Sequence, residues 1–448
     1  SELGLDSMAT VELHELALDA LGLELPYDRL LDPSTRLAEL EAAPSLTLDA
    51  RPTRERVGLP QDLVPTWSPR DPRLTQAPAK VLLTGATGYL GAHLVGELLR
   101  QTSAQLVCLV RAASHVQAQA RVEEAVVKHV RELPEGWRLR VRGLPGDFTA
   151  AQLGQREETF AALATEVDTV VHCGAWVNFL YPYRVLEAAN VHGLEQVLRL
   201  VAQGRPKVLH HLSTVAVLFS PGYERGRCYP EQHPLASDGE LPNGYEQTKW
   251  VADKHLELAR ARGFCISNHR VGYVTGAATD GHDFRLDEFF PSAIKACIQL
   301  GIAPALDTRL PVVPIDYAAA AIARIVTQPH TAGATYHIHH PRPPHLRDLL
   351  AWMNARGYQV TAVPFPHWRQ QVQALGQARE NAPGHDNALR PYAGFVRRLQ
   401  EEQTWLPELD GAQTRAAVAP LRCPEVDELL EVYFRMFERT GYLPAPRR

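Results

Sequence analysis

A tyrosine and a lysine stand four residues apart in the stretch GYEQTKW, at Tyr245 and Lys249. On a helix this spacing places both side chains on one face. A phenol is a weak acid with a pKa of about 10, and a neighbouring ammonium group stabilises the phenolate and lowers that value. The pair suits proton exchange with a reacting oxygen, and Lys249 can also hold ribose hydroxyl groups. The alternative is a solvent-facing pair on an amphipathic helix.

Two hydroxyl residues, Ser213 and Thr214, end the apolar stretch KVLHHLST upstream of this pair. A hydroxyl placed beside the phenol can donate a hydrogen bond to an oxygen that develops negative charge. The intervening segment is rich in proline and glycine, which is typical of a loop on the substrate side of a site. We therefore predict that Thr214, Tyr245 and Lys249 form the catalytic group.

Three glycines, Gly85, Gly88 and Gly91, follow the apolar stretch KVLLT in GATGYLG. A dinucleotide site needs a tight turn after a strand, close backbone approach to a pyrophosphate and close packing of the next helix. The positive N-terminal end of that helix attracts the phosphates. This context predicts a dinucleotide site, with an ordinary glycine-rich turn as the alternative.

The residue after the next apolar stretch, AQLVCLV, distinguishes between cofactors. A site for NAD usually has an acidic residue there, but this chain has Arg111. A cation suits a 2′-phosphate, so NADPH is favoured over NADH. Arg121 is either a second phosphate contact or a solvated helix residue. Asp147, in PGDF, either accepts a hydrogen bond from the adenine amino group or closes a turn.

Short apolar runs alternate with longer amphipathic runs from residue 79 onward, as expected for strands and helices. Among them we expect a third strand over RLRVRGLPGD and one long helix over residues 182–203. This alternation predicts an α/β fold with a Rossmann-like, doubly wound parallel sheet in residues 79–285. Residues 286–448 are expected to form a smaller, mostly helical substrate subdomain, with a return to the Rossmann part around residues 310–340. Residues 1–43 are expected to be helical, and the proline-rich residues 44–78 to form an extended, semi-rigid linker.

The composition is that of an ordinary globular protein, with 45% hydrophobic and 22% charged residues and a net charge of −5 over 448 residues. The small charge gives no reason to expect nucleic acid or an anionic membrane as a partner. Apolar runs are shorter than the roughly 20 residues of a membrane span. Six cysteines without CxxC pairs indicate a reducing cytoplasm. The histidines lack carboxylates or cysteines at ligand spacing, so we predict no metal site.

In their order along the chain, these motifs resemble the thioester reductase domain of the extended short-chain dehydrogenase/reductase superfamily. Such domains end nonribosomal peptide and polyketide assembly lines, carboxylic acid reductases and aminoadipate reductases. The matching stretches are VLLTGATGYLG, LVRA, the GD of PGDF, VVHCGAWVNF, NVHGL, LSTVAV, GYEQTKWVAD, HRVGYVTG and LPVVPIDYAAAAI. The resemblance implies that residues 87–90 line the pyrophosphate, that Ala175 lies on the path toward the nicotinamide ribose, and that Val271 and Gly272 lie near the carboxamide. With the residues identified above, the predicted cofactor-binding set is Gly85, Thr87, Gly88, Tyr89, Leu90, Gly91, Arg111, Arg121, Asp147, Ala175, Ser213, Tyr245, Lys249, Val271 and Gly272. Val271 stands where many relatives have proline.

The opening stretch, LGLDSMATVEL, resembles the phosphopantetheine attachment motif of acyl and peptidyl carrier proteins, with Ser7 at the attachment serine. A serine at a helix N-terminus suits a phosphodiester, because the helix end attracts an anion. The resemblance implies a partial carrier domain in residues 1–43, without its first helix, at the end of a longer protein. The alternative for Ser7 is a simple helix cap.

The resemblance implies NADPH-dependent reductive release of an acyl or peptidyl thioester, held in cis on phosphopantetheine and supplied by upstream assembly-line domains. The product would be an aldehyde, or an alcohol after a second hydride transfer. A sugar-nucleotide epimerase or dehydratase of the same superfamily is one alternative, but it would not need the carrier remnant or Arg111. A non-catalytic NADP-binding scaffold is the other, but it would not need Tyr245 and Lys249.

Overall fold

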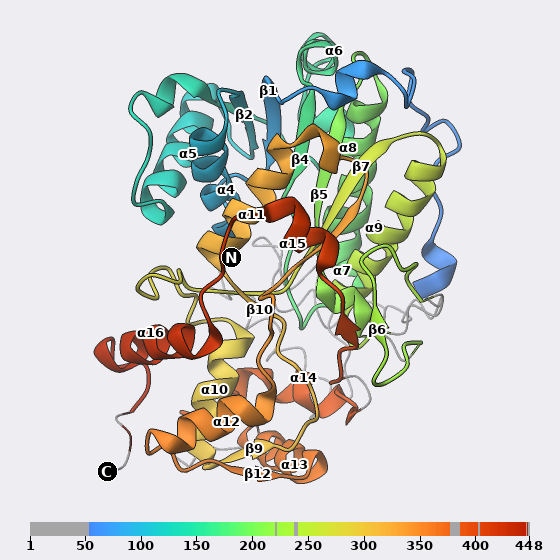
Figure 1. Ribbon diagram of the computed structural model, residues 1–448. Helices are drawn as coiled ribbons and strands as arrows, with labels where there is room; N and C mark the ends of the chain where they lie inside the picture. The colour runs from blue at the N-terminus through green and yellow to red at the C-terminus, as the bar shows by residue number, and fades with distance from the viewer. Residues whose placement is uncertain are drawn as a thin grey trace, which may run out of the picture.

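The computed structural model describes residues 53–219, 222–236, 241–376, 386–401, 404–444 and 446. Ser7 and the expected carrier remnant lie outside the described residues. The described chain forms a large parallel sheet covered by helices, with a second group of helices below it in the view of Figure 1.

Seven strands form the main sheet in the order β11-β7-β5-β4-β1-β2-β3, and each pair of neighbours is parallel. The strands are β1 (Lys80–Thr84), β2 (Gln105–Val110), β3 (Val141–Pro145), β4 (Thr169–His172), β5 (Val208–Thr214), β7 (Cys265–Val271) and β11 (Thr335–Ile338). The strand order runs outward from β1 in both directions, which is the doubly wound topology. The predicted fold class is confirmed.

Helices cover both faces of this sheet, so its strands are buried on both sides (Figure 1). One layer contains α4 (Tyr89–Gln101), α5 (His115–His129) and α11 (Ile315–Thr327). The opposite layer contains α6 (Glu157–Glu166), α8 (Gly193–Ala202) and α9 (Gly244–Ala261). Alternate residues of β1 divide between the two cores: Val81 and Leu83 pack toward the α4 layer, and Leu82 packs toward the α8 layer.

Two of the expected elements differ in detail from the structure. The sequence predicts a third strand over RLRVRGLPGD, but a 3₁₀ turn at Trp137–Arg140 precedes the shorter β3. The single helix predicted over residues 182–203 consists of α7 (Tyr183–Glu187), a π-helical turn at Ala188–His192 and α8. Such π turns widen a helix locally and are frequent at functional sites.

The second group of helices surrounds its own apolar core, which includes Leu349, Tyr433 and Phe437. Its elements are α10 (Phe289–Leu300), β9 (Ile302–Pro304), α12 (Leu346–Ala355), β12 (Thr361–Val363), α13 (Phe365–Gly376), α14 (Ala393–Arg398) and α16 (Val426–Arg439). Short parallel pairs join β9 to β12, β8 (Tyr273–Thr275) to β10 (Val312–Pro314), and β6 (Cys228–Tyr229) to β13 (Glu408–Leu409). The chain returns to the main sheet with α11, β11 and α15 (Ala412–Val418).

The described part of the proline-rich segment is packed against the main unit. Its apolar side chains Leu59, Leu63, Trp67 and Leu74 are buried in the core of the α8 layer. The Trp67 indole donates a hydrogen bond to the Val201 carbonyl oxygen at 2.9 Å. Residues 53–78 therefore form a segment that is packed in place against the α8 layer and contains two 3₁₀ turns, Thr53–Arg56 and Pro72–Thr75.

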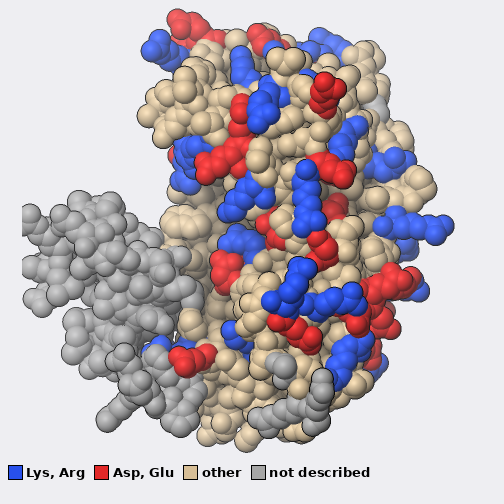
Figure 2. All heavy atoms as spheres, turned by 90° about the vertical axis from the view of Figure 1, so that its left-hand side faces the viewer, with Lys and Arg blue, Asp and Glu red and all other residues tan. Residues whose placement is uncertain are grey.

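Positive and negative side chains are interspersed on the face of the molecule drawn in Figure 2. Exposed ion pairs, such as Arg138 with Glu123 at 2.9 Å, each contribute little to the free energy of unfolding. None of the helices in the described residues is long and apolar enough to cross a bilayer.

Candidate active site

A cavity of about 850 Å³ lies at the carboxyl ends of the central parallel strands. Ligands of open α/β sheets bind at this edge, and the volume is within the range of about 300–1,000 Å³ for small-molecule sites. The predicted residues that line the cavity are Gly85, Thr87, Gly88, Tyr89, Leu90, Gly91, Arg111, Arg121, Asp147, Ala175, Ser213, Thr214, Tyr245, Val271 and Gly272. Lys249 does not line the cavity, because its side chain lies in the protein interior.

The glycine loop between β1 and α4 leaves no room for side chains at two positions. Gly85 has a φ of +74°, and a Cβ there would lie 2.7 Å from the backbone nitrogen of Gly174. A Cβ on Gly91 would lie 2.0 Å from the Gly85 carbonyl oxygen. The loop can therefore approach a pyrophosphate closely while α4 begins at Tyr89, directly after it. The residues present fit a dinucleotide.

Two arginines lie together at the end of β2. Arg111 follows the last strand residue and is exposed, and the Arg121 guanidinium donates a hydrogen bond to the Arg111 carbonyl oxygen. Both line the same cavity as the glycine loop. The Asp147 carboxylate accepts hydrogen bonds from the Thr149 amide at 2.9 Å and the Thr149 hydroxyl at 2.8 Å. Asp147 thus closes a turn, as one of its two interpretations expects, and also lines the cavity.

Tyr245 is held in the first turn of α9. The Asn243 side chain caps this helix by accepting a hydrogen bond from the Glu246 amide at 3.0 Å. A Cβ on Gly244 would lie 2.3 Å from the backbone nitrogen of Tyr183, so the start of α9 is pressed against α7. The Tyr245 ring is 8% exposed and packs edge-to-face on Phe179, with ring centroids 5.5 Å apart. These contacts fix the position of the phenol at the cavity wall.

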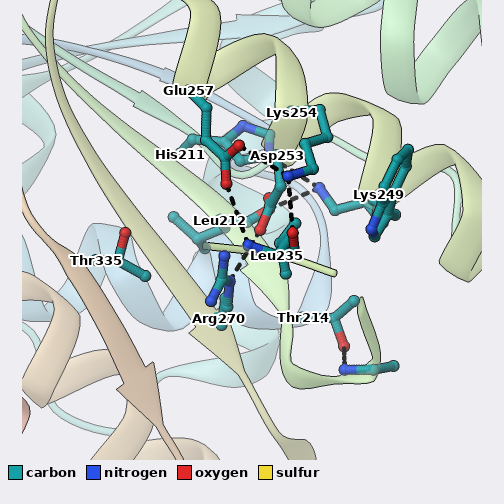
Figure 3. Close-up of polar contacts among 12 residues, drawn as sticks. His211, Leu212, Thr214, Leu235, Lys249, Asp253, Lys254, Glu257, Arg270 and Thr335 are labelled. Carbon is teal, nitrogen blue, oxygen red and sulfur yellow. Dashed lines mark hydrogen bonds and ion pairs between the residues drawn. The ribbon is translucent and has the colours of Figure 1, made fainter. Parts of the chain in front are cut away.

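The two hydroxyl residues end β5 beside the cavity. The Thr214 Oγ1 accepts a hydrogen bond from the Ala216 amide at 3.1 Å, which leaves its own proton available for another acceptor (Figure 3). The Ser213 hydroxyl is buried and makes no hydrogen bond to the described residues. A buried hydroxyl without a partner is costly, so a ligand in the cavity is a natural acceptor or donor for it.

Lys249 points from α9 into the interior, toward β5 (Figure 3). Its side chain is buried, and its Nζ donates hydrogen bonds to the Leu212 carbonyl oxygen at 2.8 Å and to His211 Nε2 at 3.1 Å. Burial lowers the pKa of Lys249 to about 8. Through these bonds, Lys249 stabilises the end of β5, which carries Ser213 and Thr214.

The pKa of Tyr245 is shifted in the direction opposite to the one expected from the sequence. Burial raises it, and the negative charges of Glu246 and Glu288 raise it further. Any lowering by Lys249 is outweighed by burial, and the Lys249 Nζ bonds to β5. At neutral pH the Tyr245 phenol is protonated and can donate a proton.

One positioning residue was missed in the sequence. Asn190 lies in the π turn before α8 and is buried. Its amide group donates to the Trp176 carbonyl oxygen and to the Thr248 hydroxyl, both at 3.0 Å, and its Oδ1 accepts from the Trp176 amide at 2.8 Å. Asn190 thus joins the loop after β4, which lines the cavity, to the helix of Tyr245. The feature of the sequence that could have identified Asn190 is its position as a polar residue in NVHGL, within an otherwise apolar helix face.

The far wall of the cavity was also missed. Phe284, Arg285 and Glu288 enter it from the segment that leads to α10. The Arg285 guanidinium lies 3.4 Å from a Glu288 carboxylate oxygen, and burial raises the pKa of Glu288. This segment has no periodic pattern, so the sequence carried no signal for its position.

The family model described as male sterility protein, an NAD-binding model, matches residues 83–322. A component of the linear gramicidin synthase of Brevibacillus parabrevis is 31% identical over 462 residues, covering 99% of this chain and 9% of that protein. The L-2-aminoadipate reductase large subunit of Penicillium chrysogenum is 29% identical over 426 residues, covering 88% of this chain and 30% of that protein. The crystal structure of the terminal R domain from the myxalamid PKS-NRPS biosynthetic pathway has a TM-score of 0.77 at 31% identity, covering 88% of this chain and 99% of that chain.

The chain spans less than a third of these two curated relatives, but it covers nearly all of the solved R domain. The family match covers the glycine loop, β2, β5 and α9, and thus the elements that bring the cavity residues together. The chain belongs to the male sterility protein family and is a thioester reductase domain of the extended short-chain dehydrogenase/reductase superfamily, an oxidoreductase that uses a nicotinamide cofactor.

Proposed function

We propose that this chain releases an acyl or peptidyl thioester from a carrier domain as an aldehyde, with NADPH as the reductant. A second reduction at the same site would give an alcohol. The observation that carries the proposal is a single cavity shared by the glycine loop, Arg111 and the hydroxyl groups of Thr214 and Tyr245. An L-2-aminoadipate reductase large subunit is also among the curated relatives.

NADPH supplies a hydride when it is bound, and the residues of the cavity are assigned to hold it. The glycine loop would bind the pyrophosphate through backbone amides and the N-terminus of α4. Arg111 and Arg121 would bind the 2′-phosphate, because no acidic residue follows β2 to bind a free ribose hydroxyl. The remaining predicted contacts toward the adenine, the ribose and the nicotinamide are Asp147, Ala175, Ser213, Val271 and Gly272.

Thr214 and Tyr245 would stabilise the charge that develops on the thioester carbonyl oxygen. Both hydroxyls line the cavity, and donors held in a buried site are far more effective than water. Because the Tyr245 phenol is protonated, it can transfer its proton to that oxygen and give a thiohemiacetal. Collapse of the thiohemiacetal returns the hydroxyl proton to the Tyr245 phenolate and breaks the C–S bond, leaving the aldehyde and a thiolate that takes a proton from solvent.

Lys249 would act as a positioning residue for this chemistry. Its two hydrogen bonds hold Leu212 and His211, and hence the adjacent hydroxyl residues at the end of β5. A contact with the ribose hydroxyl groups, as the resemblance implies, would use the third N–H of the Lys249 ammonium group.

Ser7 would carry the substrate on phosphopantetheine. The proposal is supported by the attachment motif around Ser7 and by the alignment with the linear gramicidin synthase component, which covers 99% of this chain. A tether of this kind raises the local substrate concentration to the order of millimolar. Upstream assembly-line domains would supply the acyl or peptidyl group.

The test is reduction of a soluble acyl-pantetheine thioester by the purified chain. We expect oxidation of NADPH, followed by its absorbance, and formation of an aldehyde that a hydrazine reagent traps. A matched control is Tyr358→Phe, whose phenol donates to Glu438 at 3.0 Å in the second helical group and should leave turnover unchanged. Cofactor binding without thioester reduction would indicate a scaffold, and conversion of a sugar nucleotide would indicate the epimerase alternative.

A further inference from the structure

Three side chains from distant parts of the chain meet behind the glycine loop. They are His93 on α4, His129 at the end of α5, and Asp283 in the segment between β8 and α10. The Asp283 carboxylate oxygen Oδ2 lies 3.0 Å from His93 Nε2 and 2.6 Å from His129 Nδ1. Their side chains are only 11%, 12% and 14% exposed, in the order His93, His129 and Asp283.

The three ligand-type atoms all lie within 4.8 Å of one another. Zinc in proteins binds histidine nitrogen and carboxylate oxygen at about 2.0–2.2 Å, so two ligands of a tetrahedral centre lie about 3.3 Å apart. The two distances to Asp283 are slightly shorter than this, so a small outward shift of the side chains would admit a cation. Two imidazoles and one carboxylate form a donor set suited to zinc and neighbouring transition metals.

Asp283 lies at a turn of the segment between β8 and α10. Its φ of +61° lies in the left-handed region, which aspartate adopts more readily than most residues other than glycine. This conformation is held between the two histidines, while the next two residues, Phe284 and Arg285, enter the active-site cavity. The Tyr89 ring packs edge-on against both imidazoles, with centroids 5.8 Å from His93 and 5.9 Å from His129.

We propose that His93, His129 and Asp283 bind a divalent transition-metal cation of the zinc class, which fixes the segment before α10 to the nucleotide-binding helices. The site has three protein ligands, which leaves a fourth position open to a small ligand. The cation ties α4 and α5 to the segment that carries Phe284, Arg285 and Glu288, so it determines the shape of the cavity's far wall. The site was not predicted from the sequence, because its ligands are separated by dozens of residues.

The proposal does not rest on the reductase function, since binding is measured without substrate or cofactor. The purified chain is stripped with a chelator, dialysed and titrated with Co²⁺, whose visible absorption reports low-symmetry coordination, and with Zn²⁺ in a calorimeter. We expect one equivalent of metal per chain and a rise in Tm of several degrees on saturation. His93→Gln and Asp283→Asn should each weaken binding at least tenfold, whereas His115→Gln, on an exposed residue of α5, should not.

If either ligand variant fails to fold, X-ray absorption on the zinc-loaded wild-type chain identifies the ligands directly. Scattering from two imidazoles and one carboxylate is the expected result. Absence of saturable binding to the wild-type chain would overturn the proposal, as would equal affinity in Asp283→Asn. The cluster would then be a hydrogen-bonded contact between the two parts of the chain.

Discussion

Replacing Tyr245 by phenylalanine removes one oxygen from the cavity wall and retains the ring. The ring is 8% exposed and packs edge-to-face on Phe179 within an apolar cluster that includes Leu180 and Leu186. Phenylalanine preserves these contacts and their volume, so the free energy of unfolding should change by less than about 1.5 kcal/mol. Any large loss of turnover can then be attributed to the missing hydroxyl.

The expected loss of turnover follows from the two roles of that hydroxyl. Removing one donor to a developing oxyanion in a buried site costs about 10²–10³-fold, or about 2.7–4 kcal/mol. Burial raises the pKa of Tyr245, so the variant also lacks the proton donor at neutral pH. We expect kcat to fall by at least about 10²-fold. Affinity for NADPH should be nearly unchanged, because the glycine loop and Arg111 lie at the other end of the cofactor.

The assay is single-turnover reduction of a soluble acyl-pantetheine thioester, with NADPH affinity measured separately by fluorescence. Thr214→Val removes the second donor and provides a coupled test. Both hydroxyls serve the same oxygen, so the double variant should lose less than the product of the two single losses. Turnover of Tyr245→Phe at the wild-type rate would refute the assignment of Tyr245.

Four further outcomes test the remaining assignments. Arg111→Ala should weaken NADPH binding by roughly ten- to hundredfold, because it removes a charge-assisted contact to the phosphate, and should leave NADH binding unchanged. Equal losses of affinity for NADPH and NADH would count against Arg111 as the residue that distinguishes the two cofactors. Gly91→Ala places a Cβ 2.0 Å from a backbone oxygen and should abolish cofactor binding in a fluorescence titration, unlike Gly58→Ala, where nothing lies within 4 Å. Burial lowers the pKa of Lys249 from 10.5 to about 8, so the unfolded chain binds the proton more tightly than the folded chain. Between these two pH values, the free energy of unfolding of the wild type should therefore rise relative to that of Lys249→Met, by on the order of 3 kcal/mol. A difference that does not change with pH in denaturation experiments would contradict this. Ser7→Ala should abolish the gain of phosphopantetheine mass on the peptide that contains Ser7 but not reduction of a soluble thioester. An unchanged mass gain in this variant would leave Ser7 as a helix cap.

The glycine loop and the catalytic pair were predictable because their constraints are local. Gly85 is favoured by the positive φ of the turn after β1, and Gly91 by its close approach to the Gly85 carbonyl oxygen. The four-residue spacing of Tyr245 and Lys249 places both on one face of any helix. Arg111 was predictable because the residue after the second strand of this fold has a fixed relation to the cofactor. The cavity includes the predicted members of these motifs except Lys249.

Contacts set by tertiary packing were not predictable from the sequence. The partner of Lys249 depends on which strand lies beneath α9, and this strand is β5, more than 30 residues earlier. The bonds of Asn190 to Trp176 and Thr248 depend on a π turn that no periodicity reveals. The sequence therefore indicated which groups the fold gathers at the cavity but not the environment that sets their protonation states.

That environment bears on the direction of the reaction. Oxidation of an alcohol requires a base to accept the hydroxyl proton, which for Tyr245 means the phenolate. Burial and the carboxylates of Glu246 and Glu288 disfavour that form, and the Lys249 ammonium is bonded to β5. Reduction of a carbonyl instead requires the protonated phenol, which the same environment favours. A thioester reductase therefore meets its substrate with the phenol of Tyr245 already protonated at neutral pH.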